Sequence, residues 1–365
     1  MTAPAHTATP ARPRLLDLRS GGGVLLISAA LCLIVLGQWL ALLPQRRPVI
    51  GDGHSVASYG FDLSTCLVPR DELIAAGFPK DGLPAMADPP VMTIAEADAY
   101  AHELRRAHQG KFLVASDRVI GVVVDGVARA YPLRLLTWHE VANDTLAGRP
   151  IVVTYNPLCD SVVVFDRRVR GQTLEFGVSG LVYNSNLLLY DRRSDRTQES
   201  LWSQLQFRAI TGPAAARGDT FTLVPMVLVD WSDWCAQYPD TTVIAPDRSR
   251  YKIYKRTYAP YFGSQKLRYA VTPLPLPEPW PFKTPMVAVR TMGEWHAFAI
   301  ADIVSHADAN GTWNTPVDGV DVSFTCGHDG ATVWPHVSSD TQFDTVYAFW
   351  FAWYAMQGAS TSNLP

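Results

Sequence analysis

Two stretches of this chain repeat one another, and this internal repeat constrains the fold more than any other feature. The stretches are Ala130–Phe165 and Ala297–Trp334, which align at an offset of 167 positions through their first halves. His139 falls on His306 in this alignment, and the match continues after a two-residue insertion in the second copy. Because a solenoid needs about three repeats or more, two copies indicate two similar half-domains packed together.

Each copy has the same predicted succession of a strand, a tight turn, a short strand, an amphipathic helix and two more strands. The first strands are predicted at Val119–Val124 and Met286–Val289, and the helices at Leu133–Ala142 and Ile300–Ala309. Asn143 and Asn310 follow the two helices, and we expect them to end these helices because asparagine tolerates the left-handed conformation. We therefore predict the α+β class, with two similar, mostly antiparallel β-rich halves that form a two-lobed domain.

The N-terminal region contains Val24–Leu43, a run of 20 residues without a charged side chain. This length is sufficient to span the hydrocarbon core of a bilayer. A cleaved signal peptide is the alternative, but the run is long for one and no small-x-small cleavage site follows it. We expect an uncleaved transmembrane helix with residues 1–23 as a cytoplasmic tail, because basic residues precede it. The bulk of the chain is then extracytoplasmic, in the periplasm, and the protein is a single-pass component of the cytoplasmic membrane.

The rest of the 365-residue chain divides by composition. We predict a linker and lead-in segment at 44–88, the first half of the domain at 89–250, a Pro- and Tyr-rich crossing at 251–285, and the second half at 286–365. Within these parts we expect helices at Arg70–Ala76, Thr93–His108 and Ser232–Gln237, and a strand at Phe221–Val229. The second helix begins with a capping box formed by Thr93 and Glu96. The net charge of −3 argues against nucleic acid as a partner.

Several long segments carry a resemblance to a known family. They are WHEVANDTLAGRPIVVTYNPLCDSVVVFDRR, FGVSGLVYNSNLLLYDRRSDRTQESLWSQL, WSDWCAQYPDTTV and the terminal FWFAWYA. Over roughly Pro89 to Ala359, the chain resembles the bacterial domain-of-unknown-function family 3179. The resemblance implies no settled activity. The family's usual Cys-Pro-Leu-Cys turn has Asn156 at its first position here, so only Cys159 remains of a cysteine pair.

Soft metal ligands occur at corresponding places in the two copies. They are His139 and Cys159 in the first copy and His306, Cys326 and His328 in the second. Cysteine and histidine together suit copper or zinc, so one hypothesis is a metal site in a cleft between the copies. The alternative is that His139 is a hydrogen-bonded core residue, because it lies on the apolar face of its predicted helix. No C-x-x-C or H-x-x-x-H pattern is present.

Other candidate residues also have a structural interpretation. Cys66, Cys159, Cys235 and Cys326 allow three disulfide pairings in an oxidising compartment, or none. Asp160, Asp166, Asp191 and Arg192 suggest acid–base chemistry, but we expect structural ion pairs at strand ends instead. Tyr183, Asn184, Ser185, Asn186 and Trp202 form a polar-aromatic set that suits either a ligand pocket or buried turns. The sequence has no nucleophile elbow, phosphate loop or dinucleotide fingerprint.

These features favour a non-catalytic function. We expect a membrane-anchored accessory or scaffold subunit, without a cofactor, whose domain docks on an integral membrane protein complex. An energy-transducing complex, photosynthetic or respiratory, is a natural host. The first alternative is an extracytoplasmic protein that binds copper or zinc, and the second is an enzyme of unknown reaction.

Overall fold

The chain forms two compact units in a computed structural model, Met1–Val49 and Ile50–Pro365. The described residues are 27–34, 49–109, 111–250, 252–275, 279–291, 293–328, 330–337 and 343–358. Residues 27–34 are helical, and the rest of the expected transmembrane run Val24–Leu43 lies outside the described residues. In the described part of the chain, no helix is both long enough and apolar enough to cross a membrane.

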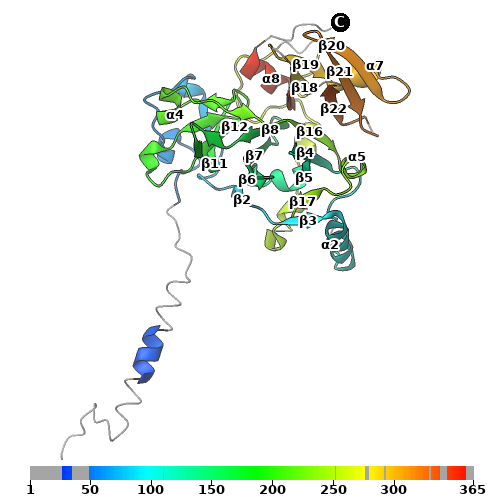
Figure 1. The fold of residues 1–365 in the computed structure, drawn as a ribbon. Coiled ribbons are helices and arrows are strands. Elements are labelled where there is room, and N and C mark those ends of the chain that lie inside the picture. Colours follow the sequence, from blue (N-terminus) through cyan, green and yellow to red (C-terminus); the bar gives the residue numbers. More distant parts are fainter. Residues whose placement is uncertain are drawn as a thin grey trace, which may run out of the picture. The chain divides into compact units, whose positions relative to one another are not determined.

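The two copies of the repeat contain the same elements in the same order within Ile50–Pro365 (Figure 1). The first copy contains β4 (Arg118–Val124), β5 (Val127–Pro132), α3 (Leu133–Leu136), β6 (Val141–Leu146), β7 (Arg149–Asn156) and β8 (Ser161–Asp166). The second contains β18 (Pro285–Arg290), β19 (His296–Ala299), α7 (Ile300–His306), β20 (Thr312–Val317), β21 (Val320–Cys326) and β22 (Val333–Val337). In both, the first two strands pair with each other and the last three form a consecutive antiparallel set.

The equivalence extends to a strand and helix after each copy. They are β16 (Met226–Asp230) with α5 (Trp231–Gln237), and β23 (Asp344–Phe349) with α8 (Trp350–Gln357). β16 pairs antiparallel with β4, and β23 pairs in the same way with β18. The two copies also contact each other through these added strands. Strand β8 of the first copy pairs with β23, which follows the second copy, and β22 of the second copy lies against β16, which follows the first. This interlocking explains why Ile50–Pro365 is one compact unit.

The central strands β7 and β8 are buried on both faces. Ile151, Val153 and Tyr155 contribute to one hydrophobic cluster, together with β4 and β5. Val152 points the other way, into a second cluster with β11 (Phe176–Tyr183) and β12 (Asn186–Asp191). Figure 1 shows β6, β7 and β8 between β11–β12 on one side and β4–β5 on the other. Alternation along a strand therefore sends side chains into two cores, which explains the uninterrupted apolar runs in the sequence.

The remaining elements extend these layers. One sheet has the order β1-β11-β12-β13-β14, with β1 (Leu73–Ala75), β13 (Leu201–Ser203) and β14 (Arg208–Ala209). Another has the order β16-β4-β5-β17-β3, with β17 (Thr242–Ile244) and β3 (Val91–Thr93). Smaller elements are β2 (Met86–Ala87), β9 (Arg168–Val169), β10 (Gln172–Thr173), β15 (Thr222–Leu223), α2 (Ile94–Arg106), α4 (Gly212–Ala216) and α6 (Ala259–Phe262), with short 3₁₀ turns at Val56–Tyr59, Arg70–Glu72, Arg196–Gln198, Arg248–Arg250 and Ile253–Lys255. Among the described strands, pairing is antiparallel except for β2 with β6 and β5 with β17. The fold is thus mixed α/β, rich in strands, with several sheets.

Three of the predicted helices are present, and one of them, α7, begins at the predicted Ile300 and ends three residues before the predicted Ala309. Helix α2 begins after Thr93, whose hydroxyl accepts from the Glu96 N–H while the Glu96 carboxylate accepts from the Thr93 N–H. This reciprocal pair is the expected capping box. Helix α5 occupies Trp231–Gln237, within one residue of its predicted start.

Other predicted elements are wrong. The helix expected at Leu133–Ala142 ends after one turn, because Glu140 adopts a φ of +55° and directs the chain into β6, so Asn143 lies in a strand. Asn310 does not end α7 either, since that helix stops at His306. The helix expected at Arg70–Ala76 is a 3₁₀ turn followed by β1, which pairs with β11. The strand expected at Phe221–Val229 is two strands, β15 and β16.

Candidate functional site

His139 lies directly after α3, and both of its ring nitrogens are engaged. Nδ1 is 2.7 Å from the carbonyl oxygen of Pro84, and Nε2 is 2.8 Å from the hydroxyl of Tyr254. Because a carbonyl only accepts, Nδ1 carries the proton and Nε2 accepts from Tyr254. Burial lowers the pKa of His139, which favours the neutral ring. His139 is therefore a hydrogen-bonded core residue, and both of its ring nitrogens have protein partners.

The other four predicted metal ligands have separate surroundings. The buried Cys159 thiol donates to the carbonyl of Ser185 at 3.3 Å, and burial raises its pKa. His306 is exposed, with Nδ1 2.8 Å from the Asp302 carbonyl oxygen. Cys326 is half-buried and His328 exposed. Within the described residues, no three His, Cys, Asp or Glu side chains form a group that could hold a metal ion, and all described cysteines are free thiols.

A polar pocket of about 310 Å³ lies beside the first copy's WHE and NPLCD segments. Its described lining residues are Ser116, Asp117, Arg118, Leu133, Arg134, Thr137, Tyr155, Tyr254, Arg256, Thr257, Tyr258 and Phe262. Helix α3, the start of β4 and Tyr155 of β7 supply some of these lining residues, and the crossing segment supplies the others. This pocket is the candidate site, because it combines concave shape with several titratable groups.

Two lining residues of the pocket, Arg118 and Tyr155, contact the carboxylate of Asp160 in the turn between β7 and β8. Asp160 has a φ of +44° and binds Arg118 through two hydrogen bonds of 2.8 and 2.9 Å. The Tyr155 hydroxyl donates to the same carboxylate at 2.8 Å. Two other lining residues also pair, since Arg134 binds Asp117 at 2.9 Å. A carboxylate held by a bidentate guanidinium and a phenol is a fixed electrostatic group, and a general base would need a free lone pair directed at a substrate.

Glu140, which lies beside this pocket, has a strongly raised pKa, and the sequence did not single it out. It is buried, and burial raises its pKa to about 8. The side-chain hydrogen bond it receives comes from Asn156 Nδ2 at 3.4 Å, while Asn156 Oδ1 accepts from the Cys159 N–H at 3.1 Å. Glu140 is thus largely protonated at neutral pH and linked to the NPLCD turn. In the sequence, Glu140 could have been noticed only because it follows His139. The residue type alone predicts neither the burial of a glutamate nor its positive φ.

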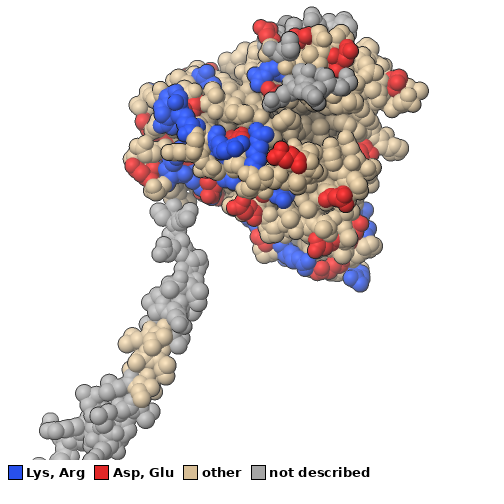
Figure 2. Space-filling view, in the orientation of Figure 1, with Lys and Arg blue, Asp and Glu red and all other residues tan. Residues whose placement is uncertain are grey.

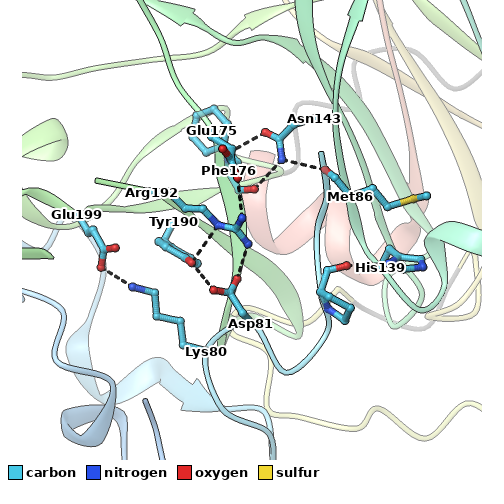
Figure 3. Close-up of polar contacts among 11 residues, drawn as sticks. Lys80, Asp81, Met86, His139, Asn143, Glu175, Phe176, Tyr190, Arg192 and Glu199 are labelled. Atoms are coloured by element: carbon cyan, nitrogen blue, oxygen red, sulfur yellow. Dashed lines mark hydrogen bonds and ion pairs between the residues drawn. The ribbon is translucent and has the colours of Figure 1, made fainter. Parts of the chain in front are cut away.

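His139 and Asn143 both hold Lys80–Ala87, the last part of the lead-in segment, in place (Figure 3). His139 holds this segment through Pro84. Asn143 donates to the carbonyl oxygens of Met86 and Phe176 at 3.2 and 2.8 Å and accepts from the Phe176 N–H at 2.8 Å. This amide therefore replaces a ladder hydrogen-bond pair between β6 and β11 and also fixes β2.

The start of the lead-in segment is held by charge. Asp81 accepts from the Tyr190 hydroxyl at 2.6 Å and from Arg192 at 2.9 Å, and Arg192 also binds Glu175 at 2.6 Å (Figure 3). Lys80 forms a buried ion pair with Glu199, with its Nζ 3.9 Å from the centre of the Tyr190 ring. The segment thus packs tightly on β12.

The carboxylates considered for acid–base chemistry are in ion pairs, as expected. Asp166 binds Arg149 and Arg168 at 3.0 and 2.6 Å, and Asp191 binds Arg193 at 2.7 Å. The partners of Asp160 and Arg192 are given above. The ion pairs expected of these residues are therefore present.

The polar-aromatic set is used in buried turns. Asn184 exchanges two hydrogen bonds with the backbone of Thr272, at 2.9 and 2.8 Å. Ser185 donates to the carbonyl of Tyr269 at 3.0 Å. Trp202 donates to Asp191 at 3.1 Å. The Asn184 and Ser185 contacts fasten the crossing segment to the turn between β11 and β12, whereas the Trp202 contact joins β13 to β12.

Comparison with known proteins supports a family assignment. A family model described as "Protein of unknown function (DUF3179)" matches residues 80–339, which begin at the lead-in segment and include both copies of the repeat. No curated protein and no solved structure matches the chain. The match covers well over half of the 365 residues, and the chain therefore belongs to the DUF3179 family.

Proposed function

We propose that this protein is a non-catalytic accessory or scaffold subunit that docks on an integral membrane protein complex. Val24–Leu43 anchors it in the cytoplasmic membrane as a single span, with the N-terminus in the cytoplasm and the family domain in the periplasm. An energy-transducing complex, respiratory or photosynthetic, is the host we favour.

One observation carries the non-catalytic part of this proposal. The groups beside the polar pocket that most often perform chemistry already hold the fold together. His139 uses both ring nitrogens, Asp160 is bound by Arg118 and Tyr155, and the Cys159 thiol is buried with a raised pKa. A nucleophilic cysteine needs the opposite, a lowered pKa and access to substrate.

The anchor rests on sequence. Val24–Leu43 contains no charged residue, and 20 helical residues span about 30 Å, the thickness of a bilayer's hydrocarbon core. Protease added to the outside of intact spheroplasts should digest the family domain, whereas inside-out vesicles should protect it. If the domain is digested only in inside-out vesicles, it lies in the cytoplasm and the proposed orientation is wrong.

Docking is tested by chemical cross-linking in native membranes, followed by detergent extraction and mass spectrometry of the cross-linked partners. We expect the same integral membrane subunits in stoichiometric amounts with the natural chain and with a variant whose Val24–Leu43 is replaced by an unrelated transmembrane segment. Partners that disappear with the replaced segment would restrict the interaction to the anchor. A chain that cross-links to no membrane protein would refute the proposal.

The copper or zinc alternative is tested by measuring the metal content of the purified protein. It predicts about one metal ion for each chain and loss of this ion in both His139→Ala and Cys159→Ser. The accessory proposal predicts a metal content that these substitutions leave unchanged. No contact in the described residues favours the alternative, and we rank an enzymatic role below it.

A further inference from the structure

A second hollow, distinct from the polar pocket, lies where the two copies of the repeat meet. Its volume is about 660 Å³, within the range of small-molecule sites. The first copy contributes β4, β16 and α5, and the second contributes β21 and β22. The described lining residues are Gly121, Val123, Pro225, Met226, Val227, Asp233, Trp234, Ala236, Gln237, Tyr238, Thr325, Trp334, Pro335, His336 and Phe343. We call this hollow the inter-copy groove.

The groove has a rigid aromatic wall on the side of α5. Trp234 is fully buried, and its indole N–H donates to the Thr241 hydroxyl at 2.9 Å. Its ring centre is 4.3 Å from that of Tyr238. The ring lies so close to β4 that a Cβ on Gly121 would be 2.2 Å from it. Because the indole is fixed by a hydrogen bond and by this close contact, the wall is formed before any ligand arrives.

Asp233 is the exception in this apolar environment. Of the described residues that line the groove, only Asp233 belongs to the Asp, Glu, Lys and Arg group. Its Oδ2 atom is buried and has no hydrogen-bond partner among the described residues. A buried polar atom without a partner costs about 1–3 kcal/mol, and more when it is charged, so such an atom calls for an explanation.

The surface around the groove fits a ligand that is mainly apolar. Figure 2 shows Lys and Arg side chains gathered over α4, β11 and β12. The described lining of the groove contains no Lys or Arg. A ligand for the groove is thus recognised by one carboxylate and by aromatic faces. Aromatic rings attract cations through their negative faces, and this attraction adds to the pairing with a carboxylate.

From these observations we propose that the inter-copy groove binds a small organic cation with an aromatic or alkyl body. The ammonium group lies against the half-buried Asp233, and the apolar body lies between Tyr238, behind which the buried Trp234 packs, and the Trp334–Pro335 side. This site is independent of the docking proposed above, because it requires neither the membrane anchor nor a protein partner.

Three matched probes test the charge preference on the purified full-length chain in detergent, by isothermal titration calorimetry. They are 2-phenylethylammonium, 2-phenylethanol and 3-phenylpropionate, which share an aromatic body and differ in charge. We expect the ammonium probe to bind at least tenfold more tightly than the other two. Equal binding of the three probes, or no binding of the ammonium probe, overturns the proposal.

Two substitutions locate the site. Asp233→Asn keeps the shape of the side chain and should weaken the ammonium probe at least tenfold, while Asp240→Asn, at an exposed position after α5, should leave its affinity unchanged. Thr325→Trp should fill the groove and abolish binding of all three probes. Unchanged affinity in Asp233→Asn or in Thr325→Trp refutes the assignment, and thermal melts of each variant verify that it is folded.

Discussion

Glu140 provides an informative test of the structure, because its raised pKa depends on burial by residues that are distant in the sequence. The carboxyl is buried between α3 and β6, and its pKa rises from a usual 4.5 to about 8. The substitution Glu140→Gln keeps the size of the side chain and an oxygen that can accept from Asn156, but it removes the titration. Comparison with the natural chain therefore isolates the free energy linked to one proton.

The sign of the effect follows from proton linkage. Between pH 4.5 and about 8 the unfolded chain releases the Glu140 proton while the folded chain retains it, so the free energy of unfolding falls as pH rises. The stabilising contribution is complete below pH 4.5 and lost above about 8. At about 1.4 kcal/mol for each pH unit, the whole window corresponds to an upper bound of roughly 5 kcal/mol. We expect the Gln variant to gain about 3–5 kcal/mol relative to the natural chain between pH 5 and pH 8.5.

The assay is urea unfolding of the full-length chain in detergent at pH 5, 6.5 and 8.5, monitored by tryptophan fluorescence. Glu294→Gln, at an exposed position, is the matched control and should differ from the natural chain by a constant amount at the three pH values. A difference for Glu140→Gln that also stays constant with pH would show that Glu140 is ionised in the folded state. The burial argument would then be wrong.

Three further predictions use the same unfolding assay. His139→Ala should lower the free energy of unfolding by about 2–4 kcal/mol, since it creates a cavity and leaves two partners unpaired, whereas His306→Ala at the equivalent exposed position should change it by less than about 0.5 kcal/mol. Asn143→Ala should lower it by about 2–3 kcal/mol, and Asn310→Ala should have almost no effect. Gly121→Ala should lower it by more than about 2 kcal/mol because the new methyl group displaces the Trp234 ring, and unchanged tryptophan fluorescence in this variant would contradict the close contact.

The sequence predicts those parts of the fold that depend on neighbours in the chain. The capping box at Thr93 and Glu96 is a local exchange of hydrogen bonds, and it appears where the sequence indicates. The repeat also has the predicted order of elements, because apolar periodicity and turn residues are preserved in both copies. The sequence predicted that Asp160 forms an ion pair, and this is confirmed. It did not predict the partner, Arg118, because the two residues are 42 positions apart.

Predictions failed where tertiary pairing overrides local preference. Leu133–Ala142 has helical periodicity, but pairing with β7 begins at Val141 and limits α3 to one turn. Asn143 looks like a helix-ending residue by type and position, yet its amide completes hydrogen bonds between β6, β2 and β11. Glu140 was not predicted as a perturbed group, because its burial depends on how β6 and the NPLCD turn pack.

The two copies of the repeat share their elements but not their surroundings, and this difference bears on function. His139 is buried beneath the lead-in segment and the crossing, whereas its equivalent His306 is exposed. Asn143 is likewise buried against β11, whereas Asn310 is exposed. The sheet that contains β11 and β12 packs against β7 and β8 of the first copy, and β18 and β19 of the second copy join the same hydrophobic cluster. Equivalence in sequence therefore does not bring the histidines and cysteines of the two copies to equivalent sites. What the copies do build together is the inter-copy groove, and the ligand proposed above therefore binds at their junction and not within either copy.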